Sequence, residues 1–229
     1  MYSCPKKKAA KNASLWLISI ALVVCSLVFA STDLQRLQNL AFTRYGRQAA
    51  DTVEQWRTLI ESINTLPDAD KIIRVNDFFN TRIKFVDDLQ TWGQEDYWAT
   101  PLETMGRRQG DCEDFSIAKY ATLLLAGVDV EKLRITYVRA RLGGPYSKEK
   151  VAHMVLAYYP QPTADPLILD NLIMAIRPAS RRPDLTPVFG FNSEQLWVGS
   201  TTKPTSKSPN AKLSKWRDLL QRMKQDGLG

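Results

Sequence analysis

The sequence predicts one α+β domain, with helices first in the chain and an antiparallel sheet after them. Apolar residues recur at helical spacing through the first half of the chain, whereas they alternate with polar residues in several later segments. The 229 residues suffice for one domain of ordinary size. With 44% hydrophobic and 24% charged residues, the composition is that of a globular protein.

Three amphipathic segments open the predicted domain. Residues 33–50 and 51–66 both carry apolar side chains at helical spacing. Pro67 ends the second helix and allows a third to begin. We then expect an extended stretch from Arg82 to Asp88, followed by a polar loop that Pro101 punctuates. The loop contains aromatic residues that are candidates for lining a cleft, namely Trp92, Tyr97 and Trp98.

A buried helix is predicted from Cys112 to Ala126. Gly110 and Asp111 precede it, and Asp111 is a suitable N-cap residue. Gly127 follows as a C-terminal stop. The segment is apolar over most of its circumference, so we expect it to lie in the core.

Beyond this helix the period of the pattern becomes two, which predicts consecutive strands. The expected strands are Leu133–Ala140, Val151–Tyr159 and Leu167–Asp170, with further candidates at Val188–Phe191 and Leu196–Val198.

Residues 1–30 have the pattern of a secretory signal peptide. Lysines cluster before an apolar run, and Val28 and Ala30 offer small side chains at a cleavage site. The apolar run is shorter than the roughly 20 residues that span a bilayer. An uncleaved signal-anchor is the alternative. The predicted domain therefore covers residues 31–199.

Residues 200–229 are predicted to form a linker and a short basic C-terminal helix. The linker is rich in Ser, Thr, Lys and Pro. We expect the helix to pack on the domain rather than bind a membrane. Without the four lysines of the signal segment, 27 basic and 24 acidic residues remain, so the net charge falls from +7 to +3. We therefore expect no nucleic-acid partner, and membrane contact only through that segment.

Cysteine is scarce, and its distribution is informative. Cys4 and Cys25 lie in the signal segment, so the mature chain would keep only Cys112. A single thiol in an exported protein is either a buried structural residue or a reactive one. The predicted helix terminus favours reactivity, because its partial positive charge stabilises a thiolate.

A nucleophilic cysteine needs a base, and the chain has a single histidine, His153. It falls on the second predicted strand, on the same face as Val155 and Ala157. A third group should orient its imidazole. Asp170 ends the next strand and is the preferred candidate. Asp165 is a competitor in a turn before a proline.

Three carboxylates crowd Cys112 in the sequence: Asp111, Glu113 and Asp114. Without compensation they would raise the pKa of the thiol. A hard divalent cation bound by their oxygens would reverse this effect. The alternative is that these acids cap the helix or face water.

The run Gly110-Asp111-Cys112-Glu113-Asp114-Phe115 resembles the nucleophile motif of the bacterial transglutaminase-like cysteine proteinases. Residues 96–101, 153–156 and 169–171 also resemble that family, and the similarity covers roughly residues 35–198. It implies a papain/transglutaminase-like fold, with the nucleophile helix packed on an antiparallel sheet. It also implies a Cys112, His153, Asp170 triad and a calcium site formed by Asp111, Glu113 and, by extension, Asp114.

The resemblance further implies a calcium-dependent periplasmic endopeptidase that cleaves the N-terminal region of a large surface adhesin involved in biofilms. Its expected regulator is an inner-membrane cyclic-di-GMP receptor that sequesters the enzyme. Two alternatives remain open from the residues. A transglutaminase would use the same triad to crosslink proteins, and a non-catalytic binding module would use only the scaffold.

Overall fold

The computed structural model describes residues 35–144, 146–205 and 208–228. The predicted signal peptide, residues 1–30, lies outside this range. Within the described part, no helix is both long enough and apolar enough to cross a membrane.

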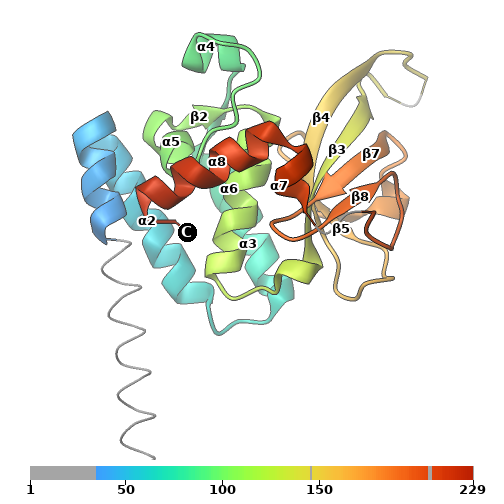
Figure 1. Ribbon diagram of the computed structural model, residues 1–229, viewed down its shortest axis with the longest axis horizontal. Coiled ribbons are helices and arrows are strands. Elements are labelled where there is room, and N and C mark those ends of the chain that lie inside the picture. The colour runs from blue at the N-terminus through green and yellow to red at the C-terminus, as the bar shows by residue number, and fades with distance from the viewer. Residues whose placement is uncertain (1–34, 145, 206–207, 229) are drawn as a thin grey trace, which may run out of the picture.

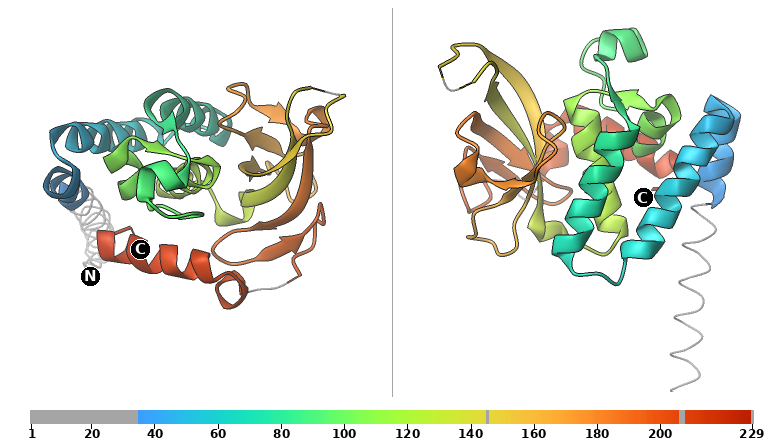
Figure 2. Two further views of the ribbon diagram at one scale, coloured as in Figure 1. Left: turned by 90° about the horizontal axis from the view of Figure 1, so that it is seen from above. Right: turned by 180° about the vertical axis from the view of Figure 1, so that it is seen from behind.

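Helices form one side of the molecule and an antiparallel sheet forms the other (Figure 1). Figure 2 shows the same division from above and from behind. The order of helices followed by strands confirms the α+β prediction.

The helical layer begins with a helix at residues 35–45, followed by α2 (Arg47–Ile63) and α3 (Asp68–Arg82). We expected the first break near residues 50 and 51, which is wrong. The chain turns at Gly46, whose φ of 85° lies in the region that glycine adopts without steric cost. The start of the third helix after Pro67 is confirmed.

The stretch predicted as extended and then as a loop contains two helices. They are α4 (Asp88–Trp92) and α5 (Pro101–Arg107). Pro101 begins a helix instead of only interrupting a loop, because its fixed φ suits the first helical turn. A capping box closes this start. The Thr100 side chain accepts from the Glu103 backbone N–H, and the Glu103 carboxylate accepts from the Thr100 N–H. Two short parallel strands, β1 (Lys84–Phe85) and β2 (Gln109–Gly110), flank these helices.

Helix α6 (Cys112–Leu125) is confirmed at the centre of the molecule. Eleven of its fourteen residues are buried, in accord with its continuous apolar character. It packs against α3 on one side and strand β4 (Lys150–Tyr158) on the other. Gly127 ends this segment with a φ of +80°.

The sheet has six antiparallel strands in the order β6-β5-β4-β3-β7-β8. Five of them match predicted strands. The remaining one, β6, has two residues and no clear alternation. Besides β4, the strands are β3 (Leu133–Arg141), β5 (Leu167–Leu169), β6 (Arg177–Pro178), β7 (Leu185–Phe191) and β8 (Leu196–Val198).

The two faces of the sheet have different environments. Met154, Leu156 and Tyr158 of β4 belong to the main core, which the helices cover. The intervening residues Val155 and Ala157 form a separate, smaller cluster on the opposite face, together with Val138 and Ile168. We call this opposite side the outer face.

The C-terminal segment returns across the helical layer. It contains the short helix α7 (Pro209–Lys212) and then α8 (Ser214–Asp226), which runs in front of α6 in Figure 1. Trp216 and Leu219 of α8 are fully buried in the main core. The predicted basic helix thus packs on the domain, as expected. The preceding residues 200–205 also lie against the sheet, since the Thr205 N–H donates to the Leu196 carbonyl at 2.8 Å.

Candidate active site

Cys112 is the first residue of α6 and is partly buried. Its thiol donates a hydrogen bond to Glu113 Oε2 at 3.0 Å. A backbone hydrogen bond from Met154 also reaches the thiol, so the sulfur lies against β4 one residue beyond His153. The helix start and the strand therefore bring the predicted nucleophile and the predicted base to the same place.

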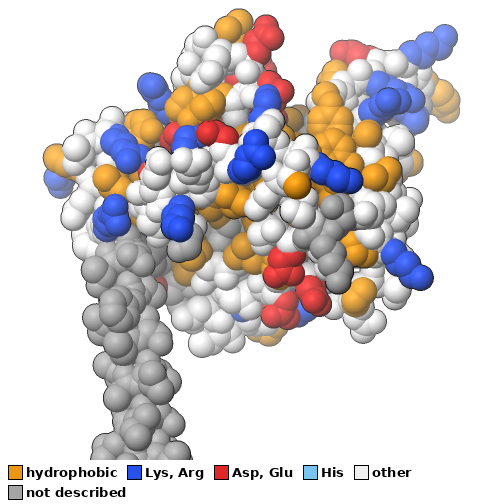
Figure 3. All heavy atoms as spheres, in the orientation of Figure 1, with side chains coloured by type: hydrophobic (Ala, Val, Ile, Leu, Met, Phe, Trp, Pro, Cys, Tyr) orange, Lys and Arg blue, Asp and Glu red, His pale blue; other side chains and the backbone are white. Residues whose placement is uncertain are grey.

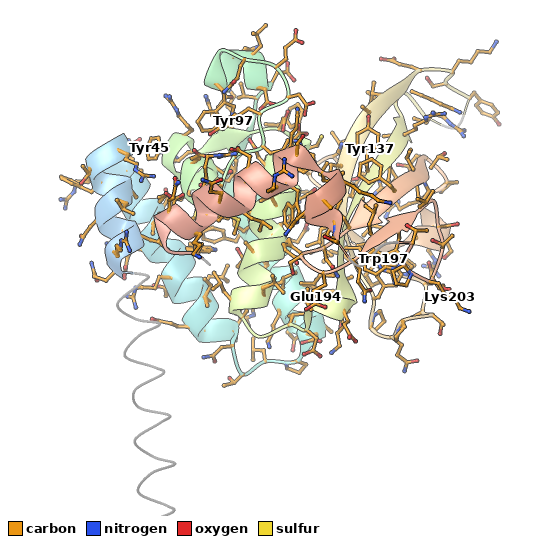
Figure 4. The ribbon with its side chains drawn as sticks, in the orientation of Figure 1. Tyr45, Tyr97, Tyr137, Glu194, Trp197 and Lys203 are labelled. Atoms are coloured by element: carbon orange, nitrogen blue, oxygen red, sulfur yellow. The ribbon has the colours of Figure 1, made fainter. Side chains whose placement is uncertain are left out.

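Cys112 and His153 line one cleft of about 590 Å³. Its walls come from the α4 region on one side and from β3, β4 and β7 on the other. Figure 3 shows the surface notched between the α4 region and the β3–β4 hairpin. The side chains on the sheet wall include Tyr137, labelled in Figure 4, and Phe189, whose rings stack at 5.3 Å.

His153 is held by a buried hydrogen bond. Its Nε2 lies 2.8 Å from Asp170 Oδ1, and the two side chains are 4% and 0% exposed. Because Asp170 occupies Nε2, Nδ1 is the ring nitrogen left for another partner. The competing candidate Asp165 accepts from the Ser180 N–H and hydroxyl instead.

Asp170 is fixed from three directions. Oδ1 also accepts from the Leu172 N–H at 3.0 Å, and Oδ2 accepts from Arg182 Nη2 at 2.7 Å. Burial would raise the pKa of Asp170, but the hydrogen bond and charge of His153, with these further donors, lower it to about 2. Asp170 is therefore a carboxylate at neutral pH and suited to orient an imidazole.

Arg182, which binds Asp170 Oδ2, was not marked by the sequence. It lies just after a 3-10 turn at Ala179–Arg181, and its guanidinium also binds Asp184. No local motif marks it, because its contact with Asp170 depends on the pairing of β5 with β6.

The surroundings of Cys112 disfavour ionisation of its thiol. Burial raises its pKa, and the charges of Glu113 and Asp111 raise it further. The helix terminus alone does not overcome these effects. Positive charge placed beside Cys112 would act in the opposite direction and lower the pKa of its thiol.

A carboxylate cluster lies directly beside the thiol. One carboxylate oxygen each from Asp88, Asp111 and Asp114 lie within 4.8 Å of one another. Burial and neighbouring acids raise the pKa of Asp88 to about 6 and that of Asp111 to about 10. Burial likewise raises the pKa of Asp114. Such a cluster is unfavourable unless protons or a cation compensate it.

The buried oxygens of this cluster fit a hard cation. Asp88 Oδ1, Asp111 Oδ1 and Asp114 Oδ2 have no hydrogen-bond partner among the described residues. Asp111 occupies the N-cap position of α6, yet its side chain makes no capping hydrogen bond. Oxygen ligands of this kind are those that Ca²⁺ prefers.

The remaining carboxylate expected at the cation, Glu113, lies in a different grouping. Its ligand atom falls within 4.8 Å of those of Asp111 and Cys112. Asp88 is the third member of the all-carboxylate cluster, and Asp111 belongs to both groupings, so Glu113 stays a predicted ligand. Sequence analysis missed Asp88 because it precedes Cys112 by 24 positions and no nearby residue marks it.

Local packing explains why the cluster forms at this position. Asp114 Oδ1 accepts from the Ala99 N–H at 2.8 Å, and Asp88 Oδ2 accepts from the Tyr97 N–H. A Cβ at Gly110 would lie 2.5 Å from Asp114 Oδ2, so the close approach requires glycine there.

The aromatic residues of the 92–98 region have separate roles. Trp98 lines the cleft and stacks on Phe191 at 5.7 Å. Trp92 and Tyr97 contact each other at 4.8 Å and do not line the cleft. Only Trp98 thus meets the expectation.

Comparison with known proteins identifies the family. The family model of the bacterial transglutaminase-like cysteine proteinases matches residues 35–184. The chain belongs to this family. It is accordingly a cysteine protease, and its fold is transglutaminase-like.

Solved structures of Legionella pneumophila LapG are similar to this member of the family. The EGTA-treated form is 39% identical with a TM-score of 0.72, over 83% of this chain and 97% of that one. The calcium-bound form is 40% identical with a TM-score of 0.71, over 83% and 98% of the two chains. None of the curated protein sequences matches the chain. The similarity to a calcium-bound neighbour agrees with the chemistry of the carboxylate cluster.

Proposed function

We propose that the protein is an exported, calcium-dependent endopeptidase in which Cys112 is the nucleophile, His153 the base and Asp170 the orienting acid. The observation that carries this proposal is the buried 2.8 Å hydrogen bond between His153 and Asp170 at a cleft that Cys112 also lines. A structural histidine would not need a carboxylate held by two further donors, the Leu172 N–H and Arg182 Nη2.

The reaction begins with proton transfer. His153 takes the proton of the Cys112 thiol, and the sulfur attacks the carbonyl carbon of a peptide bond. Asp170 keeps the imidazole oriented and stabilises its charged form. Backbone N–H groups at the start of α6, including that of Cys112, donate to the oxyanion.

Breakdown of this intermediate completes the cleavage. The C–N bond breaks as His153 returns the proton to the leaving amine, and a thioester to Cys112 remains. A water molecule then attacks the thioester, with His153 as general base, and releases a carboxylic acid and the free thiol. A transglutaminase would instead direct an amine at the same thioester.

Calcium fits the carboxylate cluster of Asp88, Asp111 and Asp114. When bound there, a divalent cation supplies positive charge next to Cys112 and so favours its thiolate. The unpartnered buried oxygens and the calcium-bound neighbour support this assignment. Glu113 adjoins the cluster and accepts a hydrogen bond from the thiol.

The family resemblance is the basis on which we propose a substrate and a regulator. We propose cleavage of the N-terminal region of a large surface adhesin in the periplasm. We propose also that an inner-membrane cyclic-di-GMP receptor sequesters the enzyme. The open cleft of about 590 Å³ is compatible with an extended peptide, which an adhesin segment would present.

The direct test uses purified protein of residues 31–229 and a recombinant adhesin N-terminal region from the same organism. We expect one or a few discrete cleavage products in calcium, and none with Cys112→Ala or after EGTA treatment. Cleavage by the Cys112→Ala protein would refute the assignment of the nucleophile. Undiminished cleavage in EGTA would refute the calcium requirement.

A labelled primary amine separates hydrolysis from acyl transfer. We expect no more label in the products than the Cys112→Ala control shows. Extensive incorporation would identify the enzyme as a transferase. Binding of the receptor's periplasmic domain is tested by co-elution in gel filtration, and separate elution would contradict that part of the proposal.

A further inference from the structure

A second cavity lies on the outer face of the sheet, apart from the cleft. Its volume is about 270 Å³, near the lower end of the range of roughly 300–1,000 Å³ for small-molecule sites. Its floor is apolar and includes Val138, Val155, Ala157 and Ile168. Neither Cys112 nor His153 lines it. A cavity of this size suits a small molecule rather than a folded partner.

Arg134 is a buried cation in the wall of this cavity. It is 6% exposed and lies between two aromatic rings, 3.9 Å from the Tyr159 centroid and 4.1 Å from that of Trp197. Figure 4 shows Trp197 on the strand layer of the molecule. The stacking and a side-chain hydrogen bond with Tyr159 hold the guanidinium in place, but neither supplies a carboxylate counter-charge.

No carboxylate of the described residues pairs with Arg134, in contrast to Arg182. Its Nη1 reaches the Thr201 carbonyl only at 3.4 Å, and its Nε has no hydrogen-bond partner within the described part of the chain. Burial consequently lowers the pKa of Arg134. A buried charge normally has a paired counter-ion.

Two further unpartnered donors belong to residues that line the same cavity. They are Nη1 of Arg182, which is 3% exposed, and Nε1 of Trp197, which is also 3% exposed. Buried donors without acceptors are uncommon in proteins, and three around one cavity point to a ligand that accepts hydrogen bonds.

The acidic groups near the cavity are already engaged. Asp165 binds Ser180, and Asp184 binds Arg182. The buried unpartnered side-chain atoms of the cavity residues are all donors, and one of them belongs to a cation without a carboxylate partner. An anionic group matches this set, and an apolar body matches the floor.

We propose that this cavity is a binding site for a small organic carboxylate with an apolar body. The carboxylate accepts from the Arg134 guanidinium and the neighbouring donors, and the apolar part lies on the floor of the outer face. Two kinds of ligand combine a carboxylate with an apolar body in this way: a free aliphatic acid and the C-terminal residue of a peptide.

The site is connected to His153 through one side chain. Arg182 Nη2 donates to Asp170 Oδ2 at 2.7 Å, and Asp170 Oδ1 binds His153 Nε2. A ligand that accepts from Arg182 Nη1 therefore acts on the group that orients Asp170. We expect occupancy of the cavity to alter the environment of His153.

Calorimetric titration of the wild-type protein with hexanoate tests the site without any protease assay. We expect saturable binding of hexanoate and none of hexan-1-ol, which has the same apolar chain without the charge. N-acetyl-leucine presents its carboxylate as a peptide C-terminus does. Tighter binding of either acid supports the site and identifies the source of ligand that it prefers.

Variants locate the binding. Arg134→Met should weaken the affinity for hexanoate by about tenfold or more, because it removes the charge and retains the apolar stem. Trp197→Phe retains a ring for stacking and removes only the N–H, so it should weaken the affinity for hexanoate by a smaller factor. This variant replaces Arg134→Met in the test if that protein does not fold. Arg139→Met is the matched control, since Arg139 lies exposed on the same strand.

Three results would each overturn the proposal. They are equal binding of hexanoate and hexan-1-ol, no saturable binding of either acid, and unchanged affinity in the folded variants.

The connection to Asp170 has its own measurement. His153 is the single histidine of the chain, so its imidazole resonances are unambiguous in untagged protein. They should shift with the same affinity as the calorimetric binding, and no shift at saturation would refute the connection.

Discussion

Replacing Lys119 by methionine should stabilise the protein at neutral and acidic pH. Lys119 lies in the middle of α6 and is 1% exposed. Its Nζ donates to Asn76 Oδ1 at 2.9 Å, and the charges of Asp170 and Asp77 favour its protonated form. Burial outweighs them and lowers the pKa of Lys119 from 10.5 to about 7.

The size of the effect follows from this shift. A pKa lowered from 10.5 to about 7 corresponds to about 5 kcal/mol against the charged form in the folded state. The variant also loses the hydrogen bond to Asn76, which should reduce its gain in stability by about 1–2 kcal/mol. The variant should therefore be more stable than the wild type by about 3 kcal/mol below pH 7.

The lowered pKa of Lys119 also fixes how the free energy of unfolding changes with pH. A lysine whose pKa is depressed on folding contributes stability that is present above pH 10.5 and is lost as pH falls towards 7. The advantage of the Lys119→Met protein should thus shrink between these values and reverse near the upper one. Asp170 does not contribute in this window, because its pKa of about 2 lies far below it.

Urea unfolding of both proteins from pH 6 to pH 10 measures the difference. Lys150→Met is the control, since Lys150 is exposed on β4 and should give no such change. A difference between wild type and Lys119→Met that stayed constant over this range would refute the reasoning. It would mean that Lys119 keeps the same protonation state in the folded and unfolded chain.

Three further substitutions test the site and the core. Asp170→Asn should lower kcat by about 10³–10⁴-fold, since an amide cannot stabilise the charged imidazole; retention of most of the activity would contradict the role of Asp170. Asp88→Asn should raise the calcium concentration needed for half-maximal activity, measured in calcium buffers, while Asp87→Asn at the neighbouring position serves as control. Trp216→Ala should reduce the free energy of unfolding by about 3–5 kcal/mol, because Trp216 is fully buried; a loss below 1 kcal/mol in urea unfolding would show that α8 contributes little to the core.

Local signals were sufficient for the central features of the fold. The Gly110-Asp111 start, the apolar run after Cys112 and Gly127 define α6 almost to the residue. The alternation around His153 predicts β4 and its outer face. The same reasoning placed Asp170 next to His153, because a neighbouring antiparallel strand ends there.

Features that depend on distant contacts were not predictable in this way. The position of Asp88 beside Asp111 depends on how the segment before α5 folds back over the start of α6. Arg182 reaches Asp170 only because β5 and β6 pair. The helix start at Pro101 is different, because the capping box of Thr100 and Glu103 that fixes it is local and can be read from the sequence.

The docking of α8 has a consequence for the order in which the protein folds. Asp226 near its end accepts from Arg44 and from Thr100, across separations of 182 and 126 residues. Arg222 of the same helix holds the carbonyl of Trp98, which forms part of the cleft wall. Contacts between such distant segments form slowly, because closing the long loop between them costs entropy. The wall is therefore complete only when residues 214–226 have docked, so a chain that lacks this helix should have no finished cleft.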